Sequence, residues 1–177
     1  GASILLPFLP MLPIQILSQN MLYDISQTAI PWDNMDEEFI KGPKVWHTKG
    51  ISRFMFFMGP VSSIFDYITF ALMYFLFSAC TPASQSLFQT GWFVEGLLSQ
   101  VLVIHIIRTG KIPFIQSRAA APVIFMTLVI AAIGLIIPYT QVGAALKMTP
   151  LPIMYYPYLA GILLSYGILT QAVKRYF

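Results

Sequence analysis

Asn20 and Asp24 lie one helical turn apart inside an apolar stretch of this chain. Tyr23 and Gln27 have the spacing that places them on the same helical face, so the four side chains form one polar stripe. Their carboxylate and amide oxygens are hard ligands, which suit Mg²⁺, Ca²⁺, Na⁺ or K⁺. The pattern alone leaves two interpretations: a cation site beside a proline-broken helix entry, or a hydrogen-bonded contact between packed helices.

Two further acids, Glu95 and Asp66, also lie in apolar stretches. An acid within the membrane is costly to keep and is therefore a functional candidate. Glu95 has Ser99 one turn later, and Asp66 has several hydroxyl side chains nearby. We treat Glu95, Ser99 and Asp66, like Tyr23 and Gln27 of the stripe, as weaker candidates for cation ligands than Asn20 and Asp24. Polar packing contacts, or for Asp66 a water-filled crevice, are the alternatives.

Several kinds of chemistry are missing from the sequence. It contains no P-loop, no nucleotide-binding fingerprint and no catalytic pair with suitable spacing, so we predict no catalytic or cofactor-binding residue. A single cysteine excludes an internal disulfide. The isolated His47 is expected to be exposed to solvent. The net charge of +3 is scattered along the chain and gives no reason to expect a nucleic-acid partner.

The composition identifies the kind of fold that must position these residues. Hydrophobic residues make up 57% of the 177 residues and charged residues only 10%, whereas soluble domains average about 25% charged residues. A membrane-spanning helix needs about 20 mostly apolar residues. We therefore predict an all-α integral membrane protein with one domain, 1–177. It contains the end of a truncated helix, 1–9, and five full transmembrane helices at 14–29, 54–79, 88–107, 119–139 and 153–173.

The positions of the basic residues orient these helices. Nine of the ten lysines and arginines fall in 30–53, in 108–118 or after 173, and only Lys147 falls in the loop 140–152. Basic residues are enriched in cytoplasmic loops. We therefore expect a cytoplasmic loop at 30–53 and a cytoplasmic C-terminus.

Three segments resemble cation-transporting P-type ATPases. Residues 8–39, FLPMLPIQILSQNMLYDISQTAIPWDNMDEEF, resemble the end of the fifth and all of the sixth transmembrane helix. The sixth helix of that superfamily carries an N-x-x-x-D pattern whose Asn and Asp ligate the transported cation. Asn20 and Asp24 occupy those positions here. Calcium pumps have threonine just before the aspartate, so Tyr23 argues against a calcium site. Residues 53–73 and 87–119 resemble the seventh and eighth helices, most closely those of the bacterial magnesium-transporting branch, type IIIB.

The resemblance implies that the chain is the C-terminal membrane part, from the end of helix five to helix ten, of a pump that couples ATP hydrolysis to Mg²⁺ entry across the bacterial inner membrane. Asn20 and Asp24 then supply part of the Mg²⁺ site. The implied partners are the lipid bilayer, transmembrane helices one to five and the cytoplasmic domains of the parent pump. The D-K-T-G-T phosphorylation motif is absent from this sequence, so ATP would act only in domains outside it and the fragment alone should be inactive.

Two other functions remain open from the sequence. The chain could be a purely structural support module, with its acids serving as packing contacts. It could also be the corresponding region of a P-type pump for another hard cation.

Overall fold

The structure is a computed structural model that describes residues 1–33, 41–42, 48–109 and 111–176. Six α-helices are formed in this part of the chain: α1 Ala2–Leu5, α2 Pro13–Gln27, α4 Thr48–Ala71, α5 Gln85–Ile107, α6 Ala121–Ile136 and α8 Tyr155–Arg175, together with the one-turn helix α7 Gln141–Ala145. The shorter elements are the 3₁₀ turns η1 Ile30–Trp32, η3 Pro82–Ser84 and η4 Ile137–Tyr139, and the π-helical segment η2 Leu72–Leu76. The described residues contain no β-strand, only an isolated bridge between Pro113 and Ser117.

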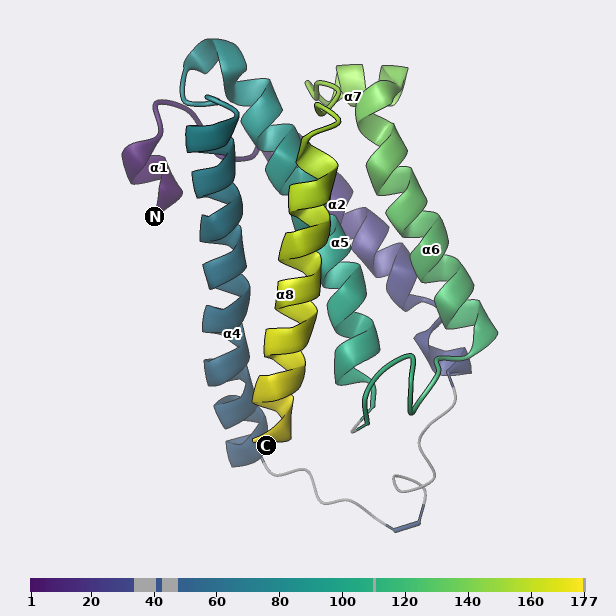
Figure 1. Cartoon of the computed structure of the whole chain (residues 1–177). Coiled ribbons are helices and arrows are strands. Elements are labelled where there is room, and N and C mark those ends of the chain that lie inside the picture. The colour runs from purple at the N-terminus through teal and green to yellow at the C-terminus, as the bar shows by residue number, and fades with distance from the viewer. Residues whose placement is uncertain (34–40, 43–47, 110, 177) are drawn as a thin grey trace.

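The long helices form one bundle with α5 at its centre. α5 contacts α2, α4, α6 and α8, while α8 also packs along α4. Figure 1 shows α4, α8, α5 and α6 running the length of the bundle, with α2 crossing behind them. The end of α5, the start of α6 and the C-terminal end of α8 lie at one end of this bundle. α7 and the turn between η2 and α5 lie at the other.

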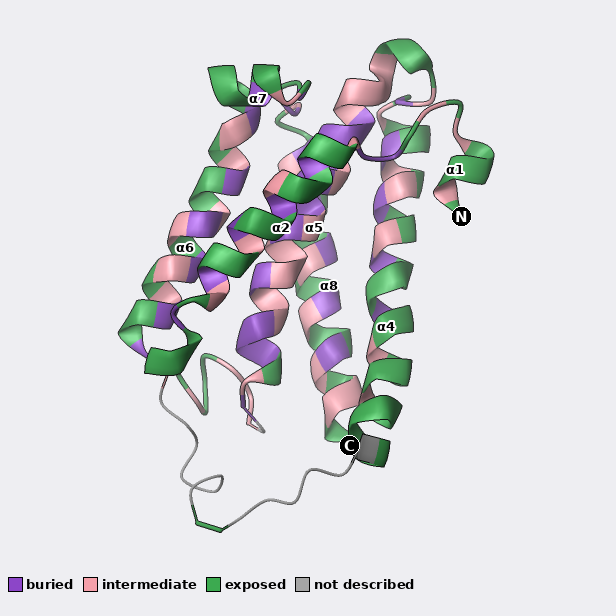
Figure 2. Ribbon diagram, turned by 180° about the vertical axis from the view of Figure 1, so that it is seen from behind, coloured by how far each residue is buried: buried purple, intermediate pink, exposed green. Residues whose placement is uncertain are grey.

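The sequence of α5 explains its central position. Apolar residues occur all around this helix, and a helix without a polar face is stable only when it is surrounded. Phe88, Phe93, Val94 and Leu97 are fully buried and form the middle of the main apolar cluster. Its neighbour α4 instead exposes large apolar side chains along much of its length, including Met55 and Phe56 (Figure 2). Such an extensive exposed apolar surface is expected where lipid replaces water.

These observations confirm the predicted all-α membrane fold. Three helical stretches are long and apolar enough to cross a membrane: Lys49–Leu76, Pro82–Ile107 and Ala121–Tyr139. α2, with 15 residues, is short for a span, and α8 carries several polar residues. The three qualifying stretches coincide with predicted spans, and α2 and α8 form at the positions of the other two.

Helix boundaries differ from the expected ones mainly at α4. This helix begins at Thr48, inside the predicted loop 30–53, because Lys49 and Arg53 end an apolar run without preventing helix formation. The helical segment ends at Leu76, and Ser78 then adopts a positive φ of 51° in the turn before α5. The N-terminal segment 1–9, predicted as the end of a longer helix, contains only the single turn α1.

Candidate functional site

α2 carries polar residues on two different faces. Its first turn is fixed by Pro13, which has no N–H to satisfy at that position, and by Gln15, whose Oε1 accepts from the Leu12 N–H at 3.1 Å. Towards the bundle, the helix buries Gln15, Gln19, Leu22 and Ser26. The structure therefore reveals a glutamine face that the sequence analysis did not single out, although its i, i+4 spacing matches that of Asn20 and Asp24.

The buried glutamines attach α2 to its neighbours. Gln15 Nε2 donates to the Leu146 carbonyl at 2.9 Å, and Gln19 Nε2 donates to the Phe93 carbonyl of α5 at 3.2 Å. Both amides are thereby satisfied away from water, where an unpaired polar group would be costly. The hydrogen-bonded helix contact that was one interpretation of the polar residues in α2 thus exists, but these glutamines form it.

The predicted polar stripe lies on the other side of the helix. Asn20 and Asp24 are exposed, and Tyr23 and Gln27 at its edges are half-buried. The stripe is therefore directed away from the α5–α6 side of the bundle, and the described part of the chain leaves the Asn20 and Asp24 oxygens free for a ligand or for a further segment of protein.

Asp66 and Glu95 come together between α4 and α5. Their carboxyl groups interact directly, and Trp92 Nε1 donates to Asp66 Oδ1 at 3.0 Å. Glu95 is 1% exposed, and its Oε2 has no hydrogen-bond partner in the described structure. Two carboxyl groups in contact repel each other when both are charged, so this pair is suited to sharing a proton or a cation.

Asp66 also borders a cavity. The cavity has a volume of about 380 Å³ and is lined by Asp66, Ser63 and Trp92 together with residues of the N-terminal segment. The acid pair is therefore partly accessible even though Glu95 is buried. Ser99, the remaining candidate, is half-buried and donates to the Gly96 carbonyl of its own helix at 3.0 Å.

The structure thus divides the seven candidate residues into two groups instead of one site. α2 packs on α5 and α6, whereas α4 packs on α5 and α8. The stripe lies on the exposed side of α2 and the acid pair lies between α4 and α5, so the two groups are in different places. No group of three or more metal-binding His, Cys, Asp or Glu side chains occurs among the described residues. His47 lies outside the described residues.

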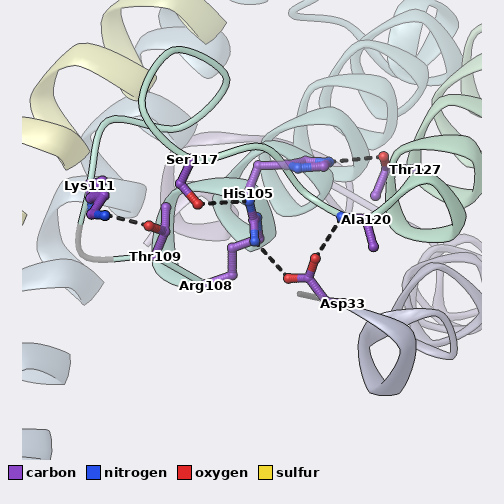
Figure 3. A network of polar contacts seen from close by, with 8 residues as sticks. All are labelled: Asp33, His105, Arg108, Thr109, Lys111, Ser117, Ala120 and Thr127. Carbon is purple, nitrogen blue, oxygen red and sulfur yellow. Dashed lines mark hydrogen bonds and ion pairs between the residues drawn. The ribbon is translucent and has the colours of Figure 1, made fainter. Parts of the chain in front are cut away.

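His105, near the end of α5, lies inside the bundle. It is buried, with Nε2 2.9 Å from Thr127 Oγ1 of α6 and its ring near that of Phe114. It therefore links α5 to α6 as part of a polar network at this end of the bundle (Figure 3).

The described helices thus form an apolar bundle of the kind found in membrane proteins, and the exposed face of α2 carries oxygen-bearing side chains. A model of the family described as cation transporting ATPase, C-terminus, matches residues 8–176. The chain belongs to this family. It is 54% identical over 176 residues to the magnesium-transporting ATPase, P-type 1, of Salmonella typhimurium, covering 99% of this chain and 19% of that protein. It is 51% identical over 176 residues to the magnesium-transporting ATPase, P-type 1, of Escherichia coli, covering 99% of this chain and 20% of that protein. The chain therefore spans about a fifth of the length of these curated relatives.

Proposed function

We propose that this chain is the C-terminal membrane part of an ATP-driven magnesium importer in the bacterial inner membrane. The observation that carries the proposal is the exposed Asn20 and Asp24 pair on α2, in a chain of the cation transporting ATPase family whose relatives are named as magnesium-transporting. ATP would be used in cytoplasmic domains outside this chain. Its partners would be the lipid bilayer, the preceding transmembrane helices and those domains.

Asn20 and Asp24 act in this proposal as ligands of the transported Mg²⁺. Mg²⁺ keeps several of its waters and needs few protein ligands, so one carboxylate and one amide are a sufficient contribution from α2. Tyr23 and Gln27 border the same face and can bind those waters. The remaining ligands would come from a segment that covers the stripe, which agrees with its exposure here.

Asp66 and Glu95 are the second group that can respond to the cation. Their contact and the unpartnered Oε2 of Glu95 support a secondary role, with Ser99 one turn away. They are separated from Asn20 and Asp24 by α5, so a single ion would not touch both groups in this arrangement.

The proposed membrane orientation has five helices crossing the membrane and a cytoplasmic C-terminus. It is supported by the basic residues: Lys174 donates to the Lys111 carbonyl close to Arg108 at the end of α5, whereas Lys147 follows α7. The end of α5 and α7 lie at opposite ends of the bundle (Figure 1).

The test uses the full-length pump purified in detergent, as wild type and as Asp24→Asn. This substitution keeps the shape of the side chain and removes its charge. We expect Mg²⁺ to stimulate ATP hydrolysis and to raise the unfolding temperature of the wild type only. A ligand bound to the folded state at a hundred times its Kd stabilises it by about 2.7 kcal/mol.

Asp66→Asn is the matched control, because it makes the same change at another intramembrane acid. It should keep an Mg²⁺ response, at reduced apparent affinity. If Asp24→Asn responds to Mg²⁺ as the wild type does, the cation binds elsewhere. The chain would then act as a support module, and Asp24→Asn would change thermal stability alone.

A further inference from the structure

Asp33 and Arg108 form an ion pair at the end of the bundle where α2, α5 and α6 meet. Arg108 Nη1 lies 2.8 Å from Asp33 Oδ2, and the two side chains are only 9% and 13% exposed. This is the only ion pair that the structure records between described residues. Because it is sheltered from water, it is screened less than a surface pair, and the loss of either partner leaves a charge without compensation.

The Asp33 carboxylate connects three elements through its two oxygens (Figure 3). While Oδ2 binds Arg108, the C-cap residue of α5, Oδ1 accepts from the N–H of Ala120 at 2.7 Å. Ala120 is the N-cap residue of α6, so the negative charge also lies at the favourable end of that helix dipole. Arg108 Nη2 lies 3.3 Å from Ser117 Oγ in the loop between the two helices.

Little chain separates Asp33 from α2. The turn η1 follows the end of α2 after two residues and ends immediately before Asp33. Between them, Ala29 is buried against Ala119 and Val123 at the start of α6. A shift of Asp33 is therefore transmitted to α2 instead of being absorbed by a flexible linker.

The opposite half of α2 is attached by glutamines, through the contacts of Gln15 and Gln19 described above. Together with Asp33 these contacts restrict both rotation and sliding of α2. Rotation matters because the Asn20 and Asp24 side chains project sideways from α2. A rotation of the helix about its own axis therefore redirects their oxygens relative to a fixed ion.

We propose that Asp33 and Arg108 are positioning residues for cation binding: their ion pair, attached to the first turn of α6, sets the orientation in which α2 presents Asn20 and Asp24. This inference rests on the proposed function. Asp33 and Arg108 act through α2 and do not touch the ion themselves.

The experiment measures Mg²⁺-dependent ATP hydrolysis of the full-length pump against Mg²⁺ concentration for wild type, Asp33→Asn, Arg108→Gln and the double variant. Removing groups that orient metal ligands commonly weakens metal affinity by about 10- to 100-fold. We therefore expect a rise of at least about tenfold in the Mg²⁺ concentration for half-maximal rate, with a maximal rate within about twofold of wild type because the reacting groups are untouched.

The double variant tests whether the two residues act as a pair. Each single variant already breaks the ion pair. The Mg²⁺ affinity of the double variant should therefore be no lower than that of the single variant with the lower affinity. Arg175→Gln is the matched control, because Arg175 is an exposed arginine at the same end of the bundle. It should leave the Mg²⁺ dependence unchanged.

Ala120→Pro tests the same connection without changing a charge. Ala120 has φ −58° and ψ 150°, a conformation that proline adopts readily. Proline lacks the backbone N–H that donates a hydrogen bond to Asp33 in the wild type. This variant should also raise the half-maximal Mg²⁺ concentration, and it decides the matter if the charge variants do not fold.

The inference is overturned if the folded Asp33 and Arg108 variants, or Ala120→Pro, keep the wild-type half-maximal Mg²⁺ concentration. A lower maximal rate with unchanged Mg²⁺ dependence overturns it as well. Asp24→Asn is assayed in parallel: if it keeps its Mg²⁺ response, the proposed function fails. If it loses that response while the Asp33 and Arg108 variants behave as wild type, only the positioning role fails.

Discussion

Replacing Gly96 with alanine should loosen the contact between α2 and α5. A Cβ at position 96 would lie 2.5 Å from Gln19 Nε2, which is too close for two atoms that are not bonded. The Gln19 amide can swing away, but it then gives up its hydrogen bond to the Phe93 carbonyl at a position where the side chain is 8% exposed. Leaving a buried amide unpaired costs about 1–3 kcal/mol.

The measurement is the free energy of unfolding of the full-length protein in detergent, compared with that of Gly161→Ala. Gly161 is also within a helix, α8, but an added Cβ there meets nothing within 4 Å. Both variants gain about 0.5–1 kcal/mol from replacing a helical glycine. We therefore expect Gly96→Ala to be less stable than Gly161→Ala by about 1–3 kcal/mol.

A second variant identifies Gln19 as the cause. In Gln19→Ala the amide is gone, so adding Gly96→Ala should cost nothing further, and the effects of the two substitutions should not add. Equal stability of Gly96→Ala and Gly161→Ala would refute the reasoning. Strictly additive effects in the double variant would show that the methyl group acts on something other than Gln19.

Three further predictions concern contacts that join α5 to its surroundings or shape the loop after α6. Tyr155→Phe removes a hydroxyl that donates to the Gly91 carbonyl at 2.6 Å from a fully buried ring, so the free energy of unfolding should fall by about 1 kcal/mol in a denaturant titration. Lys174→Met removes an ammonium group that donates to three backbone carbonyls at and beyond the end of α5, so amide hydrogen exchange there should become faster while exchange in α6 is unchanged. Gly143→Ala places a Cβ onto the backbone carbonyl of Ile137, so limited proteolysis should cut the α7 region faster than in Gly161→Ala.

The helices were predictable because the membrane imposes a length and composition that few other folds share. The boundary of α4 was not, since Lys49 and Arg53 end the apolar run but continue the helix. Hydropathy indicates which residues favour the apolar interior of the bilayer, whereas the ends of a helix depend on backbone hydrogen bonds and capping residues.

The candidate site was predictable only in part. The spacing of Asn20 and Asp24 correctly placed them on one face, but α2 also has glutamines with that spacing. Which face is buried depends on the helices packed against it, and local sequence does not contain this information. The contact between Asp66 and Glu95 was not predictable for the same reason, because it joins residues on two different helices.

The position of α8 has a consequence for how the protein is made. α8 follows every other described helix in the chain, yet it packs against both α4 and α5, where Phe65 and Tyr166 meet edge to face. During synthesis, α4 and α5 therefore enter the bilayer before the helix that covers their shared surface exists. Chains halted before residue 155 therefore retain an uncovered interface between helices, which distinguishes unfinished molecules from finished ones.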